Sequence, residues 1–349
     1  MRATARARSP VARRPRADAA RALTVVWELS HPLRPRRAHT VSTHPSDSAP
    51  VRTGQVYAQL MLVMATWGVN LVAVKYLTSQ MDIYVVAAIR IVVAFAAVSA
   101  FVLLKKGRIP RLTLAQAGWL AAAGVLVVYA HQIALVSGLR MTTAANATLI
   151  MATSPLWSVV LAAVFYRERL TSSRIGAAAL GLGGVALVVA GSGGQVAQAG
   201  AGDLLALFAV IVFVFGGLVI QRVSRALDPL TILWWMYLVG AISLTLHAAL
   251  SADTYRAESW SSDLWPWVVV VFSAVIASGV CNLLWNAGIA RLGMSRAAMF
   301  VNWLPIFGLL AAAIFLGERI TLLHLAGLAC VLSGTWLGLR PAPAAPATR

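Results

Sequence analysis

Ten long apolar segments, separated by short polar breaks, dominate the chain from Val56 to Leu339. A helix needs about 20 predominantly apolar residues to cross a bilayer, whereas a membrane strand needs only about 9–11. Only 11% of the 349 residues are charged, against about 25% in a typical soluble domain. The sequence therefore predicts an all-α polytopic membrane protein with ten transmembrane helices. The expected spans are Val56–Leu77, Ile83–Leu104, Leu114–Ser137, Thr142–Phe165, Ser172–Ala190, Asp203–Gln221, Pro229–Leu250, Trp265–Ala287, Ser295–Leu316 and Leu322–Leu339.

Lysine and arginine are distributed unevenly over the connections between these spans. Cytoplasmic connections of membrane proteins are enriched in both residues. The richer set then lies inside, so we expect both termini in the cytoplasm of a bacterial inner membrane. The expected internal set is Lys105, Lys106, Arg108, Arg111, Arg167, Arg169, Arg174, Arg222, Arg225, Arg291 and Arg296, and the external set is Arg140, Arg256 and Arg319.

Residues 1–55 carry much of the net charge of +18 as arginines among proline, alanine, serine and threonine. This region has no apolar run that could span a bilayer, so we expect a basic, disordered, cytoplasmic tail. Translated sequence upstream of the true start, contact with lipid headgroups or nucleic acid, and a transit peptide are the alternatives. No nucleic-acid partner is expected. A short second tail is predicted over residues 341–349.

The chain repeats itself at an offset of 150 residues. Pro155 aligns with Pro305, and the block Glu-Arg-Leu-Thr from Glu168 reappears as Glu-Arg-Ile-Thr from Glu318. Each copy contains five predicted spans. Because five is odd, the second copy enters the membrane with opposite polarity. Two inverted five-helix repeats are expected, over residues 56–191 and 203–340, and such repeats are typical of secondary transporters.

Several of these residues resemble the drug/metabolite transporter superfamily, and within it the EamA-type branch. The resemblance lies in Trp67–Asn70 (Trp-Gly-Val-Asn), in Arg90, and in two matched runs, from Thr142 to Thr171 and from Ser295 to Thr321. It covers nearly the whole apolar region. It implies a carrier built of two EamA-like halves that moves small organic solutes, often outward. We therefore expect a secondary transporter of small organic metabolites, namely amino acids, their derivatives or drug-like solutes, which exports them by alternating access. A non-transporting scaffold or sensor and an intramembrane enzyme are the alternatives.

Polar and aromatic residues within the spans are the candidates for a central cavity. An asparagine in lipid must find a hydrogen-bond partner, so its helix face looks inward. Arg90 keeps its charge, and either meets a substrate carboxylate, snorkels to the surface or pairs with a backbone carbonyl. His131 is the well-embedded group that could titrate near neutral pH, in a coupling or a structural role. The cavity candidates are Trp67, Asn70, Arg90, His131, Asn146, Trp157, Asn282, Asn302 and Trp303.

Four further residues are candidates for gating or for a structural role. Pro155 and Pro305 would kink their spans, as hinges or as packing bends. Glu168 and Glu318 close two spans, where each could accept hydrogen bonds from the start of the following helix or act in a gate.

The motifs predict no cofactor, no metal and no catalysis. The chain has no Gly-x-x-x-x-Gly-Lys-Ser/Thr sequence for ATP, and no span holds histidine and carboxylate at metal-ligand spacing. The expected partners are a small-molecule substrate and the lipid bilayer. Small residues such as Gly334 and Gly338 leave a homodimer open.

Overall fold

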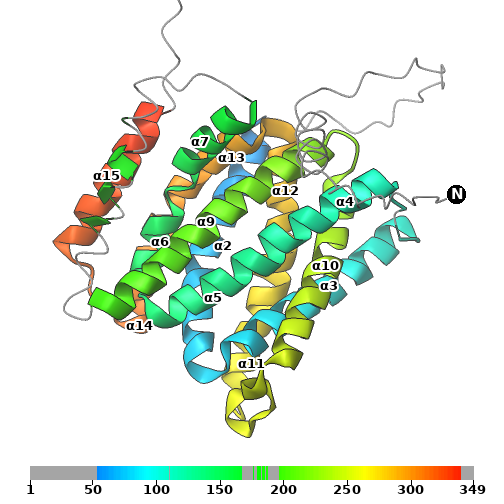
Figure 1. Cartoon of the computed structure of the whole chain (residues 1–349), viewed down its shortest axis with the longest axis horizontal. Coiled ribbons are helices and arrows are strands. Elements are labelled where there is room, and N and C mark those ends of the chain that lie inside the picture. Colours follow the sequence, from blue (N-terminus) through cyan, green and yellow to red (C-terminus); the bar gives the residue numbers. More distant parts are fainter. Residues whose placement is uncertain are drawn as a thin grey trace, which may run out of the picture. The chain divides into compact units, whose positions relative to one another are not determined.

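The computed structural model describes residues 53–109, 111–166 and 196–338, together with isolated residues between 176 and 187. These residues form helices and connections without any strand, which confirms the all-α class (Figure 1). Both predicted tails lie outside the described residues, apart from the start of the first helix. Glu168 and most of the predicted fifth span also lie outside them.

Eight described helical stretches are long and apolar enough to cross a membrane. A further helix, α15 (Leu322–Gly338), is apolar over the shorter stretch Leu322–Gly334. It occupies the place of the predicted tenth span, while the fifth is mostly not described, so the total of ten stays a prediction. The eight stretches are Gly54–Gln80, Ile83–Lys106, Leu114–Met141, Ala144–Leu161, Gly200–Val223, Pro229–Leu250, Leu264–Leu292 and Met294–Leu316.

Four of these stretches are regular α-helices: α2 (Thr53–Gln80), α3 (Ile83–Lys106), α9 (Val196–Val223) and α10 (Pro229–Leu250). Their ends follow local chemistry. Asp82 caps α3 by accepting the backbone N–H groups of Tyr84 and Val85. Gly107 ends it with φ +65°, a conformation that glycine adopts without steric cost.

The third and eighth spans contain π-helical turns, which hydropathy does not predict. The third consists of α4 (Leu114–Ala123), η1 (Gly124–Ala130) and α5 (His131–Met141). The eighth consists of α11 (Leu264–Val271), η4 (Phe272–Val280) and α12 (Cys281–Leu292). The helices α5 and α12 begin 150 residues apart, so the irregularity recurs at the offset of the sequence repeat.

The fourth and ninth spans are broken near Pro155 and Pro305, where bends were expected. The fourth divides into α6 (Ala144–Met151) and α7 (Ser154–Tyr166). The ninth divides into α13 (Met294–Ala298), the 3₁₀ turn η5 (Met299–Trp303) and α14 (Leu304–Leu316). Pro155 and Pro305 are each the second residue of the later helix, where the missing N–H costs least. The expected bends are therefore helix breaks.

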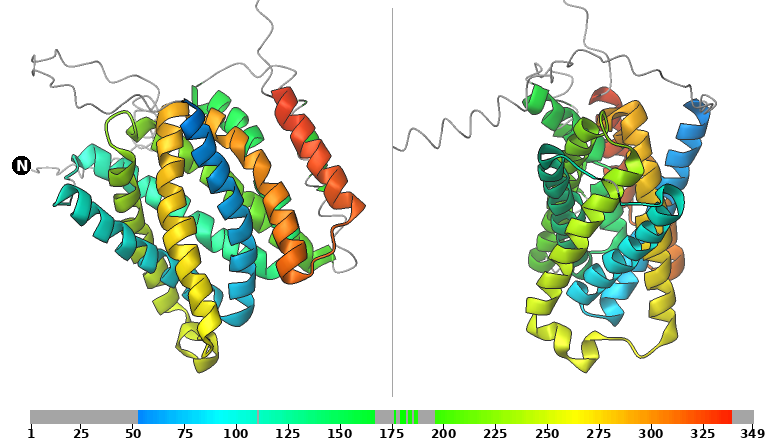
Figure 2. Two further views of the ribbon diagram at one scale, coloured as in Figure 1. Left: turned by 180° about the vertical axis from the view of Figure 1, so that it is seen from behind. Right: turned by 90° about the vertical axis from the view of Figure 1, so that its right-hand side faces the viewer.

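Helices from the two halves of the sequence pack reciprocally. The first-half helices α5 and α7 pack on α9, and the second-half helices α12 and α14 pack on α2. Figure 2 shows α2 and α14 side by side within the bundle. The largest hydrophobic cluster draws buried residues from both halves, Leu60, Met64, Ala209 and Val214 among them.

The chain direction gives the described helices two common ends. We call one the Lys106 end, where α3, α9 and α12 finish, and the other the Asp203 end, where α2, α5, α10 and α14 finish. Two short 3₁₀ turns, η2 (Ala252–Tyr255) and η3 (Ala257–Ser259), lie at the Asp203 end, where the Asp82 backbone N–H bonds the Ser259 carbonyl. The Lys106 end carries the larger number of described Lys and Arg residues.

Candidate functional site

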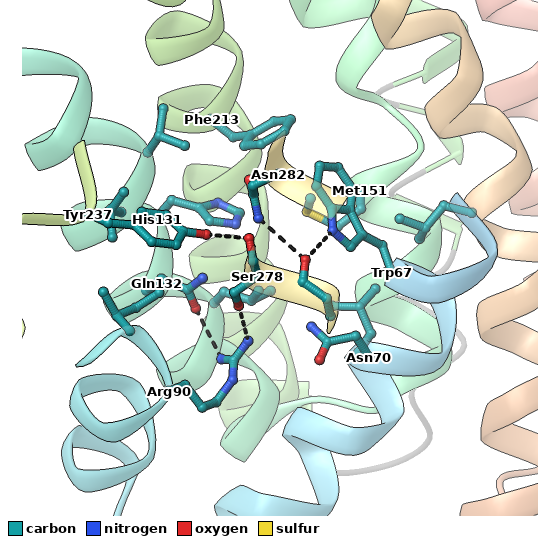
Figure 3. Close-up of a pocket in the computed structure, with 17 residues that line it drawn as sticks. Trp67, Asn70, Arg90, His131, Gln132, Met151, Phe213, Tyr237, Ser278 and Asn282 are labelled. Atoms are coloured by element: carbon teal, nitrogen blue, oxygen red, sulfur yellow. Dashed lines mark hydrogen bonds between the residues drawn. The ribbon is translucent and has the colours of Figure 1, made fainter. Parts of the chain in front are cut away.

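A cavity of about 60 Å³ lies between helices of both halves (Figure 3). A volume of this size has room for several water molecules, so a larger solute requires the surrounding helices to move apart. The lining residues are Trp67, Asn70, Leu71, Arg90, Ile91, Val127, Val128, His131, Gln132, Leu135, Met151, Phe213, Tyr237, Ala277, Ser278, Asn282 and Leu304.

The π-helical turns supply two walls of the cavity. Val127 and Val128 come from η1, and Ala277 and Ser278 come from η4. Side chains of other helices bond the backbone carbonyls of η4. Trp67 Nε1 donates to Ala277 O at 3.0 Å, and the Tyr237 hydroxyl donates to Ser278 O at 2.6 Å. Figure 3 shows these bonds crossing the cavity wall. The site therefore includes main-chain oxygens as well as side chains.

The guanidinium group of Arg90 is the principal charge at the cavity, and the residue is only 1% exposed. Nε donates to Ser273 Oγ at 2.6 Å, Nη1 to Gln132 Oε1 at 3.2 Å and Nη2 to Ser278 Oγ at 3.5 Å. Ser273 in turn donates to Asn70 Oδ1 at 2.5 Å. These partners are all neutral.

No carboxylate forms an ion pair with Arg90 among the residues that the structure describes. A guanidinium has five N–H donors, and three are accounted for by these hydrogen bonds, which leaves two for a ligand. A buried charge is costly unless it is paired. The cavity therefore favours an anionic group beside Arg90.

Aromatic rings form another wall of the cavity. The Trp67 ring lies 5.9 Å from that of Phe213 and 5.3 Å from that of Trp285, measured between centroids. Phe213 also lies 5.2 Å from the His131 ring, whose Nδ1 bonds the Ala209 carbonyl at 3.0 Å. Rings at these distances pack favourably and offer an apolar face to a solute. The cavity thus combines one cation, amide and hydroxyl groups, and an aromatic wall.

The sequence model of the EamA-like transporter family matches this chain twice, over residues 54–190 and 200–340. The chain belongs to the EamA-like transporter family. Together with its apolar helices, this makes it a multi-pass membrane protein of a family whose members transport small molecules through the lipid bilayer.

Similar proteins carry transporter names rather than enzyme names. The "Uncharacterized transporter YetK" of Bacillus subtilis is 22% identical over 284 residues, which are 80% of this chain and 86% of that protein. The "Probable amino-acid metabolite efflux pump" of Salmonella typhimurium is 24% identical over 286 residues, 80% of this chain and 93% of that protein. The "Probable terminal-alkyne amino-acid exporter" of Streptantibioticus cattleyicolor is 26% identical over 223 residues, 62% and 71% of the two chains.

A solved structure, titled "Crystal structure of protein", shares the fold. It superimposes with a TM-score of 0.60 over 82% of this chain and 95% of that one, at 17% sequence identity. At this identity the likeness concerns the fold alone.

Five of the predicted cavity residues of this EamA-like protein line one cavity: Trp67, Asn70, Arg90, His131 and Asn282. Their part in substrate binding stays a prediction. The expectation that Arg90 snorkels or pairs with a backbone carbonyl is wrong, because its bonds go to buried side chains. The signal in the sequence was the rarity of polar residues in these spans.

Four other candidates do not line this cavity. Trp157 is half-buried on α7, Asn302 lies in η5, and Trp303 is 47% exposed. The helix breaks explain the difference, because they change the register that a continuous span would keep. Asn146 lies at the Asp203 end of α6 and joins a separate polar cluster.

Glu318 does not serve the helix that follows it. Its Oε1 and Oε2 accept the backbone N–H groups of Ala144 and Ala145, each at 2.9 Å. The expected bond to the start of the helix at Leu322 is therefore corrected: Glu318 caps α6, from the other half of the chain. Glu168, its counterpart in the repeat, lies outside the described residues. Whether either acts in a gate stays a prediction.

Sequence reasoning missed several cavity residues, including Ser278 and its neighbour in the network, Ser273. They are five residues apart, which places them on different faces of an α-helix. The i→i+5 pattern of a π-helix brings them to one side, against Arg90. Two small polar residues in an apolar span were the available signal. The π-helical turn that brings these two serines together has no signature in hydropathy.

Proposed function

We propose that this protein is a secondary carrier that exports small carboxylate-bearing metabolites, amino acids or their derivatives, across the bacterial inner membrane. The observation that carries the proposal is the buried Arg90 guanidinium, which faces the cavity with neutral partners. A fixed cation in a low-dielectric cavity attracts a carboxylate, which accepts two parallel N–H bonds from a guanidinium. The export direction rests on the names of two relatives, the "Probable amino-acid metabolite efflux pump" and the "Probable terminal-alkyne amino-acid exporter".

The other cavity residues can contact the amino group and the side chain of such a solute. Asn70 and Asn282 offer amide groups, and the aromatic wall of Trp67 and Phe213 can cover an apolar side chain. A zwitterion also needs acceptors for its ammonium group. The Ala277 carbonyl at the cavity wall accepts Trp67 Nε1 at 3.0 Å and Asn282 Nδ2 at 3.4 Å. An ammonium group would replace the longer of these two bonds, without adding charge to the wall.

Two inverted halves would provide alternating access in this carrier. The reciprocal packing on α2 and α9, and the breaks repeated at an offset of 150 residues, support this arrangement. The distribution of Lys and Arg supports a cytoplasmic Lys106 end and an external Asp203 end, with both termini inside.

Ligand binding to purified protein tests the role of Arg90. Phenylalanine should bind wild-type protein, whereas phenethylamine, which lacks the carboxylate, should bind far more weakly. Arg90→Gln should weaken phenylalanine binding about 10- to 100-fold, because a charge-assisted hydrogen bond is worth about 1.5–3 kcal/mol.

Arg90→Lys is the matched control for charge. It keeps the cation but loses the planar fork, so we expect an intermediate affinity. Alanine and ethylamine repeat the comparison with a small side chain. Equal binding of acid and amine by wild-type protein, or unchanged binding in Arg90→Gln, would contradict the proposed recognition.

A further inference from the structure

A second buried polar cluster lies at the Asp203 end, apart from the Arg90 cavity. Asp203 on α9 is 1% exposed and His324 on α15 is 7% exposed. Asn146 on α6 joins them: its Nδ2 lies 3.3 and 3.4 Å from the two Asp203 carboxylate oxygens, and its Oδ1 lies 2.9 Å from His324 Nε2. The Thr142 hydroxyl also donates to Asp203. Four helical segments thus meet at one buried Asp–amide–His chain.

The partners of His324 fix its neutral tautomer. Asn146 presents its N–H₂ to a carboxylate, so its oxygen faces the ring and His324 Nε2 must carry a hydrogen. On the other side, Nδ1 accepts the backbone N–H of Thr321 at 3.0 Å and lies 2.9 Å from the Thr321 hydroxyl oxygen. Nδ1 is therefore the unprotonated nitrogen of the ring, at the start of α15, and both of its partners belong to Thr321.

We propose that His324 is a proton-binding site, with Asp203 as its counter-charge, which opens the external end of the carrier when a proton arrives from outside. The inference rests on the proposed function only for the orientation of that end. The proton adds to the Nδ1 lone pair and gives an imidazolium, with no other bond made or broken. An Nδ1–H group then faces the N–H of Thr321, which loses its acceptor, and the Thr321 hydroxyl turns from donor to acceptor of the new Nδ1–H.

Loss of the hydrogen bond between the Thr321 N–H and His324 Nδ1 weakens the contacts that close this end. Thr321 belongs to the connection that carries Glu318, whose carboxylate caps α6 at Ala144 and Ala145. The Thr321 hydroxyl also accepts the His324 backbone N–H at 3.3 Å, so the connection shifts without detaching. This shift draws the Glu318 carboxylate away from the first turn of α6. Two backbone N–H groups would then need water, which favours a hydrated, open end.

The charges around His324 favour an imidazolium. Asp203 and Glu318 are its acidic neighbours, whereas Arg319 is exposed. Lys75 on α2 is engaged by the carbonyls of Leu139 and Thr142, at 2.6 and 2.7 Å. The described residues of α6 and α7, which pack on α15, bring no further charged side chain. Burial of the ring disfavours its protonated form, and the opposite charges nearby offset part of this cost, so protonation and entry of water at this end favour each other.

The cluster is linked to the cavity by short rigid elements. Asn146 lies near the start of α6 and Met151, which lines the cavity, is its last residue. At 1.5 Å per residue, about 8 Å separates them. Likewise α5 carries His131 at its start and is followed by Thr142. A movement at the cluster therefore reaches the substrate site.

Thiol labelling measures this opening without any substrate. Cys281 and Cys330 are first replaced by serine, and Ala145→Cys, a position only 1% exposed, becomes the reporter. A membrane-impermeant maleimide is added outside right-side-out vesicles between pH 5 and 8. Glu258→Cys, at an exposed position of η3, is labelled in parallel, and the ratio of the two rates removes the pH dependence of the thiol reaction itself.

We expect this ratio to rise as pH falls, by up to about tenfold per pH unit, the limit for one proton. In His324→Gln the ratio should stay low at every pH, because glutamine cannot take the proton. In Asp203→Asn the rise should move to lower pH, because the counter-charge is gone. His247→Gln, a histidine of the same end whose Nδ1 bonds the Tyr129 hydroxyl, should keep the wild-type curve.

Three results would overturn the proposal. These are a flat ratio in wild-type protein, an unchanged rise in His324→Gln, and labelling of Glu258→Cys from the inside only. If His324→Gln fails to insert into the membrane, the test rests on two curves of labelling ratio against pH, that of wild-type protein and the shifted one of Asp203→Asn. A protein that moves no solute would refute the carrier assignment but leave these labelling results intact.

Discussion

At the scale of single residues, the buried ionisable groups are arranged in two sets with different chemistry. Arg90 is surrounded by neutral partners and faces a cavity, which suits an arriving anion. Asp203 and His324 are joined to each other through Asn146, which suits a proton. Each group is expensive to keep within a membrane unless a ligand or partner compensates it. Substrate and proton would therefore use separate sites.

An ion pair at the Lys106 end joins the last residue of α3 to Asp228, which precedes α10, and gives a test of pH dependence. Asp228 accepts Lys106 Nζ at 2.6 Å and caps α10 through Thr231. Burial raises the pKa of this carboxyl, but the hydrogen bonds from Lys106 and Thr231 outweigh it, so the pKa lies below its usual value. A lowered pKa stabilises the fold above the unfolded value of about 4 and loses this effect as pH falls through the folded value.

We therefore expect wild-type protein to exceed Asp228→Asn in stability at pH 6, by up to about 1 kcal/mol for a half-exposed pair. Asparagine still caps the helix, so the substitution removes mainly the charge. The difference should vanish as pH falls below about 4. Thermal unfolding of both proteins in detergent between pH 3 and 7 measures it, and a constant difference over this range would show that the carboxylate charge does not contribute.

At the scale of elements, the breaks in the fourth and ninth spans are the features most suited to movement. Pro155 has no N–H group to donate to the Met151 carbonyl. The Ser154 hydroxyl donates to that carbonyl instead, at 2.5 Å. The short helix α6 is thereby separated from α7, with the polar cluster at one end and the cavity at the other. Hinges of this kind absorb backbone changes at few positions.

Pro155→Ala tests this separation. A backbone N–H at position 155 can bond the Met151 carbonyl and join α6 to α7, so we expect unchanged or higher thermal stability and a lower rate of solute flux. Pro229→Ala is the matched control, because Pro229 begins the unbroken helix α10, and its flux should match that of wild type. Normal flux in Pro155→Ala would show that the break is only a packing feature.

Hydropathy was enough to predict the all-α class, and eight of the ten predicted spans correspond to described helical stretches of membrane-crossing length. The π-helical turns were not predictable, because a shift from i→i+4 to i→i+5 bonding leaves composition unchanged. Polar residues far from span ends, such as Trp67, Asn70 and Arg90, were found by their rarity. Asp203 is the first residue of a predicted span, a position that gives no sign of a role, and only tertiary packing brings it to Asn146 and His324.

At the scale of the whole molecule, the central cavity lies between helices of both halves, and hydrogen bonds at the Asp203 end join the two halves. Glu318 from the second half caps α6 of the first, while Asp203 bonds Thr142 and Asn146. In the proposed carrier, opening this end would require the halves to separate there. Reciprocal packing on α2 and α9 would then let the opposite end close as this one opens.

Solute counterflow in proteoliposomes tests the central claim, that this protein is a carrier which recognises a carboxylate through Arg90. Vesicles loaded with unlabelled phenylalanine receive a trace of labelled phenylalanine outside. Wild-type protein should accumulate the label transiently above equilibrium, whereas Arg90→Gln and a phenethylamine pair should give little or no overshoot. The same overshoot with the amine and in Arg90→Gln, or no overshoot with any amino acid, would contradict it.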